Sequence, residues 1–426
     1  MATLRWIARL VEPLAGENKS HILYGLAKRV VALFAALILF PIGLALLPFA
    51  LPFYLYAHSR RPNVSFIHNP KASGLQGVAE DTLHVRTYNV GMGYECFSAL
   101  SDLRDVKVRA KELSDWIESD PNLPEVIFFQ EAFHIDATRI LCDGLKEKYP
   151  YVIHNIAPHV LGLNNGGVIA SQHPIEEFSF RPFGNLLGPE RLTTRGLLKI
   201  RIEKGGKKID VYGTHLQALL GDLRAKIRKE QMEQIIGWIE EDQKENSSDV
   251  QFLLGDLNAS KITAWGDEDH TDDKMLDLMG EEFTDVFLND HNDVGERTSG
   301  EAQFTEKDAP DGLSEKLVEP TGSWCIGPFA EIGAALRLAE QYIGDFIRYV
   351  GKKKIKDVPR PHNWGTEQWA SFQHACTARF DFILRRKGGA GTAKDDRAEI
   401  RRVKVLPGTQ SAPSDHLPID GILKIS

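Results

Sequence analysis

The sequence has few cysteines, and they are not arranged to bind a metal. Only four occur in 426 residues, and no two stand at the short spacings that paired metal ligands use. This distribution argues against a structural zinc site and against the disulfide framework of a small secreted scaffold. Free thiols in a reducing compartment are the expected state, with a pairing of Cys325 and Cys376 left open.

The sequence also lacks an excess of positive charge and the common nucleotide-binding motifs. Asp and Glu number 59 against 51 for Lys and Arg, which gives a formal net charge of −8 and disfavours a non-specific nucleic-acid binder. No glycine-rich phosphate loop and no Gly-X-Ser-X-Gly elbow occurs, so nucleotide hydrolysis and serine-esterase chemistry have no support. Anionic substrates remain open, because a bound metal ion can reverse the local sign of an acidic site.

Charge is absent from one long stretch near the N-terminus. Residues 30–57 read VVALFAALILFPIGLALLPFALPFYLYA and contain no charged side chain. A helix needs about 20 apolar residues to cross a bilayer. The run starts too far into the chain and is too long for a simple cleaved signal peptide. We therefore predict a membrane-associated N-terminal region over residues 1–57, with its hydrophobic segment at 30–57.

Three prolines and two basic flanks leave two arrangements open for this segment. Each proline removes a backbone donor and favours a kink, and basic pairs stand on both sides, at 28–29 and 60–61. The positive-inside rule then assigns no orientation, so a single span and a re-entrant hairpin both fit. The basic pairs could attract anionic phospholipids. We expect the rest of the chain in an aqueous compartment on the cytoplasmic side.

The remainder of the chain has the pattern of one large α/β domain. Residues 58–81 are polar, with prolines and glycines that predict a linker, and short apolar strands and helical segments follow over 82–426. Helices are predicted over 104–119, 136–147 and 222–242, and strands include LHVRTYNV, EVIFFQ, KKIDVYG, QFLLG, RFDFILR and PIDGILKI. Mixed strands with helices outside them predict two sheets packed face to face and flanked by helices.

A helical insertion is expected around residues 325–375. Within it, residues 328–350 place apolar side chains at three- and four-residue steps, and four lysines follow shortly after. This stripe predicts an amphipathic helix. The helix either packs on the domain, with a solvated basic tail, or makes a second contact with a membrane surface.

Polar side chains gather where the apolar strands stop. They are Asn89, Glu131, His215, Asp256, Asn258, Asp381 and His416. A carboxylate that follows a buried strand is costly to bury unless it is paired or binds a metal. Each short motif alone is typical of a turn or a cap, and the ordered set is the stronger signal. Several strand ends at one edge of a sandwich would bring these groups together, so we expect a polar site there.

The chemistry of this set suits Mg²⁺, with Mn²⁺ as an alternative. Mg²⁺ prefers oxygen ligands, usually one or two carboxylates together with water and phosphate oxygens. Glu131 is the expected ligand, supported by Asn89. Asp256 and Asn258 fit a place near a nucleophilic water or a second metal. Zinc is disfavoured because no Cys-His cluster is present.

The motifs NV, QE, GTHLQA, GDLN, RFDF and SDH occur in this order along the chain. Over residues 82–426 the chain thereby resembles the endonuclease/exonuclease/phosphatase superfamily, which has a DNase-I-like fold. The resemblance implies a four-layered α/β sandwich and Mg²⁺-dependent phosphoester hydrolysis. Within the superfamily the chain is similar to the neutral sphingomyelinases. GTHLQA, NGGVIAS and PTGSW are like the bacterial secreted members, and the apolar segment ending in HSRRP is like the membrane-anchored animal members.

The resemblance implies roles for the residues that would bind metal and move a proton. Glu131 would coordinate Mg²⁺ with help from Asn89, and His416 would act as general base, oriented by Asp381. An imidazole titrates near neutral pH and so suits proton removal, and a carboxylate fixes its tautomer and supports the imidazolium.

Other positions would handle the phosphate and the substrate. Asp256 and Asn258 would position water or contact the phosphate group. His215 would stabilise the charged phosphoryl group or assist the leaving group, and Asn165, which opens NGGVIAS, would contact the substrate.

The stretch GPERLTTRG, at 188–196, matches a family loop that carries an Asp and, five residues later, a Lys. In the membrane-anchored animal enzymes this pair acts as a conformational switch. Glu190 and Arg195 stand at the matching positions here, so the signs and the spacing are kept while the side chains are longer. A switch-like or substrate-facing role is implied, and a surface ion pair of small energetic worth is the alternative.

The implied function is hydrolysis of sphingomyelin in a lipid bilayer to ceramide and phosphocholine. Another phosphoesterase of the same fold is the alternative, acting on inositol phospholipids, on other phospholipids or on nucleic acid. The acidic charge disfavours nucleic acid as a partner. A non-catalytic membrane scaffold would be expected to lack a core polar residue, and none is missing.

Overall fold

The computed structural model describes residues 52, 63–73, 79–93, 105–158, 163–218, 222–259, 272–291, 381–389, 393–400, 414, 416 and 418–426. Apart from residue 52, the hydrophobic segment 30–57 lies outside these ranges. So do the insertion around 325–375, the helix expected at 328–350 and the Cys325–Cys376 pair. Among the described residues, no helix is both long enough and apolar enough to cross a bilayer.

Strands and helices alternate along the described chain. The strands are β1 (Ser65–His68), β2 (Thr82–Asn89), β3 (Val126–Gln130), β4 (Tyr151–His154), β5 (Val168–Ser171), β6 (Glu177–Pro182), β7 (Gly196–Lys204), β8 (Lys207–His215), β9 (Val250–Asp256), β10 (Phe283–Asp285), β11 (Asp381–Arg386), β12 (Arg397–Ile400) and β13 (Ile419–Lys424). The helices are α4 (Val106–Ser119), α5 (Ile135–Lys148), α6 (Asp222–Glu245), α7 (Asp273–Glu282), α8 (Val286–His291) and the 3₁₀ turns η3 (Gly188–Leu192) and η6 (Ala393–Asp395).

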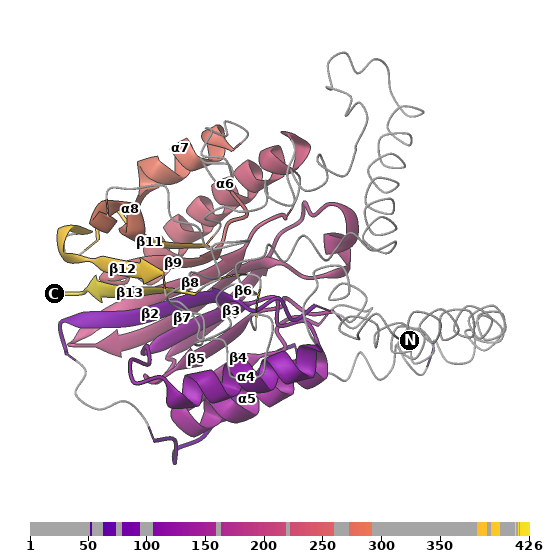
Figure 1. The fold of residues 1–426 in the computed structure, drawn as a ribbon. Coiled ribbons are helices and arrows are strands. Elements are labelled where there is room, and N and C mark those ends of the chain that lie inside the picture. The colour runs from indigo at the N-terminus through magenta and orange to yellow at the C-terminus, as the bar shows by residue number, and fades with distance from the viewer. Residues whose placement is uncertain are drawn as a thin grey trace, which may run out of the picture.

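These elements form two packed sheets with helices on both outer faces (Figure 1). One sheet has the strand order β1-β4-β5-β3-β2-β13-β12, and the other has the order β10-β11-β9-β8-β7-β6. Within these sheets β2 pairs in parallel with β3, and β8 pairs in parallel with β9. Helices α4 and α5 cover the first sheet, and α6 and α7 cover the second. The predicted sandwich of two sheets flanked by helices is confirmed.

Alternation along the strands builds three apolar cores between the four layers. On β3, Val126 and Phe128 point between the sheets, whereas Ile127 and Phe129 point towards α4 and α5. The third core joins the second sheet to α6 and α7. Because β3 buries both faces, its sequence is a continuous apolar run, which is typical of a central strand with a parallel neighbour.

Helix α4 starts at a polar cap and ties the first sheet to the polar edge. The side chain of Asp105 accepts hydrogen bonds from two backbone N–H groups of the first turn, which stabilises the helix start. One turn later, the fully buried Arg109 donates to the carbonyls of Val90, at 3.1 Å, and Gly91, at 2.8 Å. The loop that follows Asn89 is thereby fixed against the helix layer.

Strand register brings the polar residues of the strand ends to one edge of the sandwich. Asn89 pairs with Gln130, next to Glu131, at the ends of two parallel strands. In the second sheet, Asp256 pairs with His215 in parallel β8 and with Asp381 at the start of antiparallel β11. Carboxyl ends of parallel strands meet at the same edge, so these groups gather there by register alone.

One predicted boundary is wrong. The linker predicted over 58–81 contains β1, which pairs with β4 at the edge of the first sheet. Four residues are too few to show a two-residue period clearly, and an edge strand lacks the continuous apolar run of a buried one. The sequence pattern also does not reveal β10, α7, α8 and β12, which are short or lack strong periodicity.

A buried ion pair in the first sheet makes stability depend on acid pH. Asp420 of β13 accepts from Arg86 Nε at 2.5 Å and from Arg86 Nη2 at 2.8 Å. Burial alone would raise the pKa of Asp420, but the Arg86 guanidinium outweighs burial and holds this pKa at about 2, below its ordinary 3.8. A depressed native pKa contributes stability above the unfolded pKa that is lost as pH falls through the folded one.

We therefore expect the free energy of unfolding to fall by about 2 kcal/mol between pH 4 and pH 2 through this group alone. Urea unfolding of the wild type and Asp420→Asn at several pH values measures it. The variant should be less stable at pH 6, and the difference between the two proteins should shrink towards pH 2. A difference that stays constant over this range would contradict the assignment.

Candidate active site

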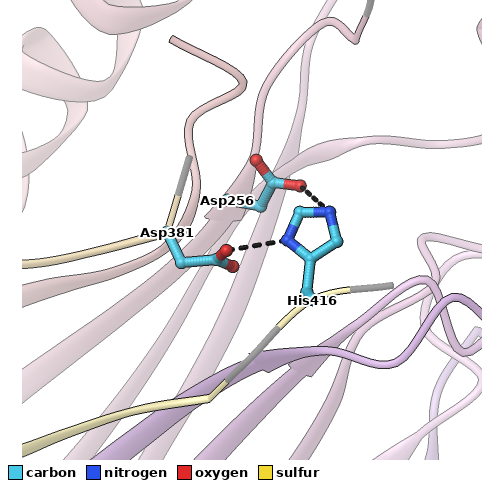
Figure 2. Close-up of side chains that lie close together, drawn as sticks. All are labelled: Asp256, Asp381 and His416. Carbon is cyan, nitrogen blue, oxygen red and sulfur yellow. Dashed lines mark hydrogen bonds and ion pairs between the residues drawn. The ribbon is translucent and has the colours of Figure 1, made fainter. Parts of the chain in front are cut away.

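The strand-end residues converge on a His–Asp pair beside a second buried carboxylate (Figure 2). Nδ1 of His416 lies 2.7 Å from Oδ2 of Asp381, and Nε2 of His416 lies 4.0 Å from Oδ2 of Asp256. All three side chains are buried. Because a carboxylate is a hydrogen-bond acceptor, Nδ1 carries the proton and donates a hydrogen bond to Asp381, so Nε2 is the unprotonated, basic nitrogen of the ring.

The backbone before His416 is tied to the end of β2. The N–H of His416 donates to Oγ of Ser414 at 3.2 Å, and Oγ of Ser414 donates to the carbonyl of Asn89 at 2.7 Å. This link places the segment that contains His416 against the end of the strand that contains Asn89. Ser414 begins the SDH motif, so the serine of that motif has a positioning role.

Asp256 is held by two donors and destabilised by a neighbouring charge. Asn89 Nδ2 donates to Oδ2 at 2.9 Å, and the N–H of Asn258 donates to Oδ1 at 2.8 Å. Burial, and then the negative charge of Asp381, raise the pKa of Asp256 to about 7, although His416 and both hydrogen bonds oppose this. Two carboxylates this close repel each other, and a bound cation would relieve the repulsion.

His215 lies against the same carboxylates with its ring unsatisfied. Its Nε2 is 3.4 Å from Oδ2 of Asp256 and 3.8 Å from Oε1 of Glu131. Neither ring nitrogen makes a hydrogen bond within the part of the chain that the structure describes. Burial lowers the pKa of His215 well below its usual value, and the charges of Arg195 and His416 act in the same direction. The imidazole is therefore neutral at physiological pH and has one N–H to donate.

Two residues at this edge have left-handed backbone conformations. Glu131 has φ 61° directly after β3, and Asn258 has φ 52° two residues after β9 ends. Residues other than glycine rarely take positive φ, and such strain concentrates at functional sites. The side chain of Glu131 is 30% exposed, against 2% for that of Asp256, so Glu131 is the more open carboxylate.

The donor set fits a hard divalent cation. Ligand atoms of Asp256, Asp381 and His416 all lie within 4.8 Å of one another, and this is the group of such residues found in the described ranges. Glu131 stands near it, because Glu131 and Asp256 both lie close to Nε2 of His215. Carboxylate oxygens are the ligands that Mg²⁺ and Mn²⁺ prefer over imidazole. Mg²⁺ would thus be held by carboxylates here, with His416 left to its hydrogen bond.

Asn89, which the sequence predicts to support Glu131 in binding the metal, makes two hydrogen bonds within the protein. Oδ1 of Asn89 accepts from the N–H of Gly91 at 3.0 Å, and its amide nitrogen donates to Asp256. These two hydrogen bonds orient Asn89 and hold Asp256, and the support of the metal by Asn89 stays a prediction. Pattern reasoning missed that Asp381 could share a cation with Asp256, and the signal for it was an Asp at adjoining ends of two paired strands, GD and RFD.

The Glu190–Arg195 pair is buried, so the alternative of a surface ion pair is wrong. Nη2 of Arg195 lies 3.3 Å from Oε1 of Glu190, and the exposed fractions of the side chains are 5% and 13%. Arg195 also donates to the carbonyl of Leu216, and Oε1 of Glu190 accepts from the N–H of Ala218 at 2.9 Å. Burial raises the pKa of Glu190, and Arg195 opposes this only in part. The pair thus forms hydrogen bonds with the backbone that follows His215.

Asn165 is buried and contacts the loop that carries this pair. Its side-chain Nδ2 donates to the carbonyl of Thr194 at 3.1 Å. The contact fixes the residue before Arg195. In the described contacts Asn165 therefore acts on the Glu190–Arg195 loop.

The fold of this chain is shared with proteins of known structure. The crystal structure of SmcL matches 81% of this chain and all of that chain, with a TM-score of 0.52 at 19% identity. A crystal structure of a beta toxin mutant from Staphylococcus aureus with bound magnesium ions matches 80% of this chain and all of that one, with a TM-score of 0.51 at 20% identity. At these identities the likeness shows a shared fold.

The family model of the endonuclease/exonuclease/phosphatase family matches residues 87–416, and the chain belongs to this family. That range runs from β2 to His416 and so contains the whole site. The predicted superfamily membership is confirmed.

Curated relatives match a smaller part of the chain. Sphingomyelinase C of Listeria ivanovii is 32% identical over 173 residues, which are 36% of this chain and 50% of the relative. Sphingomyelinase C of Leptospira interrogans is 34% identical over 156 residues, 32% of this chain and 28% of the relative. Sphingomyelin phosphodiesterase 5 of Danio rerio is 31% identical over 153 residues, with 32% and 28% covered. The matched segments thus span half or less of each of these relatives.

Proposed function

We propose that the protein is a metal-dependent phosphodiesterase that hydrolyses sphingomyelin to ceramide and phosphocholine. The observation that carries the proposal is the buried Asp381–His416 pair, at 2.7 Å, beside the second carboxylate of Asp256. The similarity of the chain to proteins named sphingomyelinase C supports this choice of substrate.

His416 is the group best placed to remove a proton from water. Its Nδ1–H is held by Asp381, which fixes the tautomer and stabilises the imidazolium after proton transfer. Nε2 is then the basic atom, and it faces Asp256. A water between Nε2 and the phosphorus of the substrate would lose its proton to His416 as it attacks.

Asp256 and His215 are placed to handle the charge that develops on the phosphate. Burial and the charge of Asp381 raise the pKa of Asp256, and a bound cation would offset both effects and favour the carboxylate. The neutral His215 can donate one hydrogen bond to a phosphoryl oxygen or to the leaving alkoxide of ceramide. Asn258 acts through its backbone N–H on Asp256, because its side-chain amide donates to the carbonyl of Leu216 at 3.2 Å.

Glu131 and Asp256 are the residues that would hold Mg²⁺, with Asp381 next to them. When bound, the ion would polarise a phosphoryl oxygen and neutralise charge in the transition state. Mn²⁺ offers the same chemistry with the same oxygen ligands.

A lipid substrate agrees with the hydrophobic segment at 30–57, which we propose holds the domain at a membrane. Sphingomyelin leaves the bilayer only at high cost, so an enzyme that stays on the surface gains access to it. The basic pairs at 28–29 and 60–61 would add attraction to anionic phospholipids on the cytoplasmic side.

Sphingomyelin vesicles test the proposal with purified full-length protein. Release of phosphocholine is expected with Mg²⁺ present and should fall by at least about 100-fold when the metal is chelated, because the ion contributes several kcal/mol to the transition state. Phosphoinositide vesicles and duplex DNA serve as comparison substrates. Hydrolysis of either one without phosphocholine release would overturn the assignment.

Sedimentation of the same vesicles, with and without phosphatidylserine, shows whether the protein binds membranes and whether anionic lipid strengthens the binding.

A further inference from the structure

A short segment follows β8 and is held mostly by side chains. It consists of residues 216–218, called here the 216–218 segment, and it comes directly after His215. Its three backbone N–H groups donate, in order, to the carbonyl of Asp256 at 3.0 Å, to Oε1 of Gln231 at 2.9 Å and to Oε1 of Glu190 at 2.9 Å. Two of these three partners are side chains from other elements.

The three carbonyls of the 216–218 segment are held in the same way. The first accepts from Arg195 and from Nδ2 of Asn258 at 3.2 Å. The second accepts from Nη1 of Arg228 at 2.9 Å, and the third from Nε2 of Gln217 at 3.2 Å. Every backbone polar group of the segment therefore has a partner, and most partners are side chains. Such a segment keeps its shape only while those side chains stay in place.

Arg228 is the most firmly anchored of these partners. It belongs to α6, which crosses the outer face of the second sheet (Figure 1), and it is fully buried. Its Nε and Nη2 bind the two oxygens of Asp272, each at 2.9 Å. A planar guanidinium that binds both oxygens of one carboxylate has a fixed orientation. The third nitrogen, Nη1, is thereby directed at the carbonyl of Gln217.

His215 depends on this anchoring more than the other histidine of the site does. The ring of His416 is fixed by its hydrogen bond to Asp381, whereas neither ring nitrogen of His215 makes a hydrogen bond among the described residues. Its ring stands 3.4 Å from Asp256 without being oriented by it. The position of the His215 ring therefore depends on the packing around this buried side chain and on its backbone, which the 216–218 segment continues.

We propose that Arg228 is a positioning residue for His215. Held by Asp272, it fixes the 216–218 segment and so holds the imidazole at the distance from Asp256 and Glu131 that the reaction needs. The role rests on the proposed phosphodiesterase function. A displacement of about 1 Å in a catalytic group can cost 100-fold in rate, so the clamp matters even without touching substrate.

Arg201 offers a matched control at the opposite end of the second sheet. It is buried, it binds both oxygens of Asp210, at 2.6 and 2.7 Å, and it donates to one backbone carbonyl, that of Asn246. The substitutions Arg228→Lys and Arg201→Lys thus remove the same kind of bidentate pair. We expect Arg228→Lys to lower kcat about tenfold to 100-fold with KM little changed, while Arg201→Lys keeps kcat within about twofold at equal loss of thermal stability. Parallel losses of kcat in both variants would overturn the proposal.

A double-mutant cycle tests whether Arg228 acts through His215. If it does, Arg228→Lys should have little further effect on kcat in a His215→Gln background. Independent effects, whose fold-changes in kcat multiply, would mean that Arg228 acts by another route and would overturn the proposal.

Should Arg228→Lys fail to fold, Gln231→Met and Gln231→Glu replace it. Met removes the acceptor for the N–H of Gln217, whereas Glu keeps it, so only the Glu variant should retain kcat.

Histidine NMR separates this proposal from the proposed function. The ring signals of His215 are identified in isotope-labelled full-length protein as those that disappear in His215→Gln. Arg228→Lys should shift them and Arg201→Lys should leave them in place, whatever substrate the protein uses. A wild-type protein without phosphodiesterase activity would refute the function and leave this shift intact, whereas unshifted His215 signals in Arg228→Lys would refute the positioning role.

Discussion

Replacing His416 by Gln is expected to lower kcat for phosphodiester hydrolysis by about 10²- to 10⁴-fold, the usual contribution of a general base. Gln has a similar size and can still accept a hydrogen bond, but it cannot take up the proton of an attacking water. Asp381→Asn should have an effect of the same order, because an amide can donate to Nδ1 and so favours the wrong tautomer. Initial rates on sphingomyelin vesicles at saturating Mg²⁺ measure both.

His173 supplies the matched control for this experiment. Its Nε2 lies 2.7 Å from Oε1 of the buried Glu125, so it forms the same type of His–carboxylate pair. Glu125 precedes β3, whereas Glu131 follows it, so the pair lies at the other end of that strand. His173→Gln should leave kcat within about twofold. Retention of more than about a tenth of wild-type kcat in His416→Gln would show that His416 is not the base.

Replacing Glu131 by Gln is expected to raise the Mg²⁺ concentration for half-maximal activity by at least about tenfold, because an amide oxygen is a weaker ligand than a carboxylate. The change keeps the size of the side chain and adds no strain to the left-handed backbone at this position. Activity as a function of Mg²⁺ concentration, together with calorimetric titration of the metal, measures the effect. The exposed Glu147 of α5 provides the control substitution Glu147→Gln, which should leave the Mg²⁺ dependence unchanged.

The same titrations decide between two ligand sets. If Glu131 and Asp256 hold the ion, His416→Gln should lower kcat without moving the Mg²⁺ midpoint. If the ion instead sits among Asp256, Asp381 and His416, whose ligand atoms lie within 4.8 Å of one another, His416→Gln should move the midpoint and Glu131→Gln should not. The second result would contradict the role of Glu131 as ligand.

Much of the site could be predicted because its residues stand at the ends of strands that their own sequences define. Apolar runs such as EVIFFQ and QFLLG fold as central strands in any packing that buries them, and the polar residue after each run must then lie at the sheet edge. Asp381 was expected to orient His416, and Oδ2 of Asp381 lies 2.7 Å from Nδ1 of His416. The three long predicted helices correspond to α4, α5 and α6.

Other features could not be predicted, because they depend on what lies opposite in space. The strand β1 is stable only through its pairing with β4, and its four residues carry little pattern of their own. Burial of Glu190 and Arg195 depends on the backbone after β8, which is far from them in sequence. Arg228 and Gln231 interrupt the apolar stripe of α6, and their spacing alone did not show that they bind the 216–218 segment.

The sequence by itself determined the family, the order of the central strands and of the three long helices, and the identity of the polar residues at the strand ends. These follow from local patterns, since periodicity sets the element type and a polar residue after a buried run must find a partner. Only the tertiary structure decided which contacts those residues make with one another and which of them are held by other residues. Asn89 positions Asp256, His215 is neutral and unbonded among the described residues, and Arg228 holds the backbone beside it. The reason is that burial, charge repulsion and hydrogen-bond direction depend on distances between segments that the sequence separates.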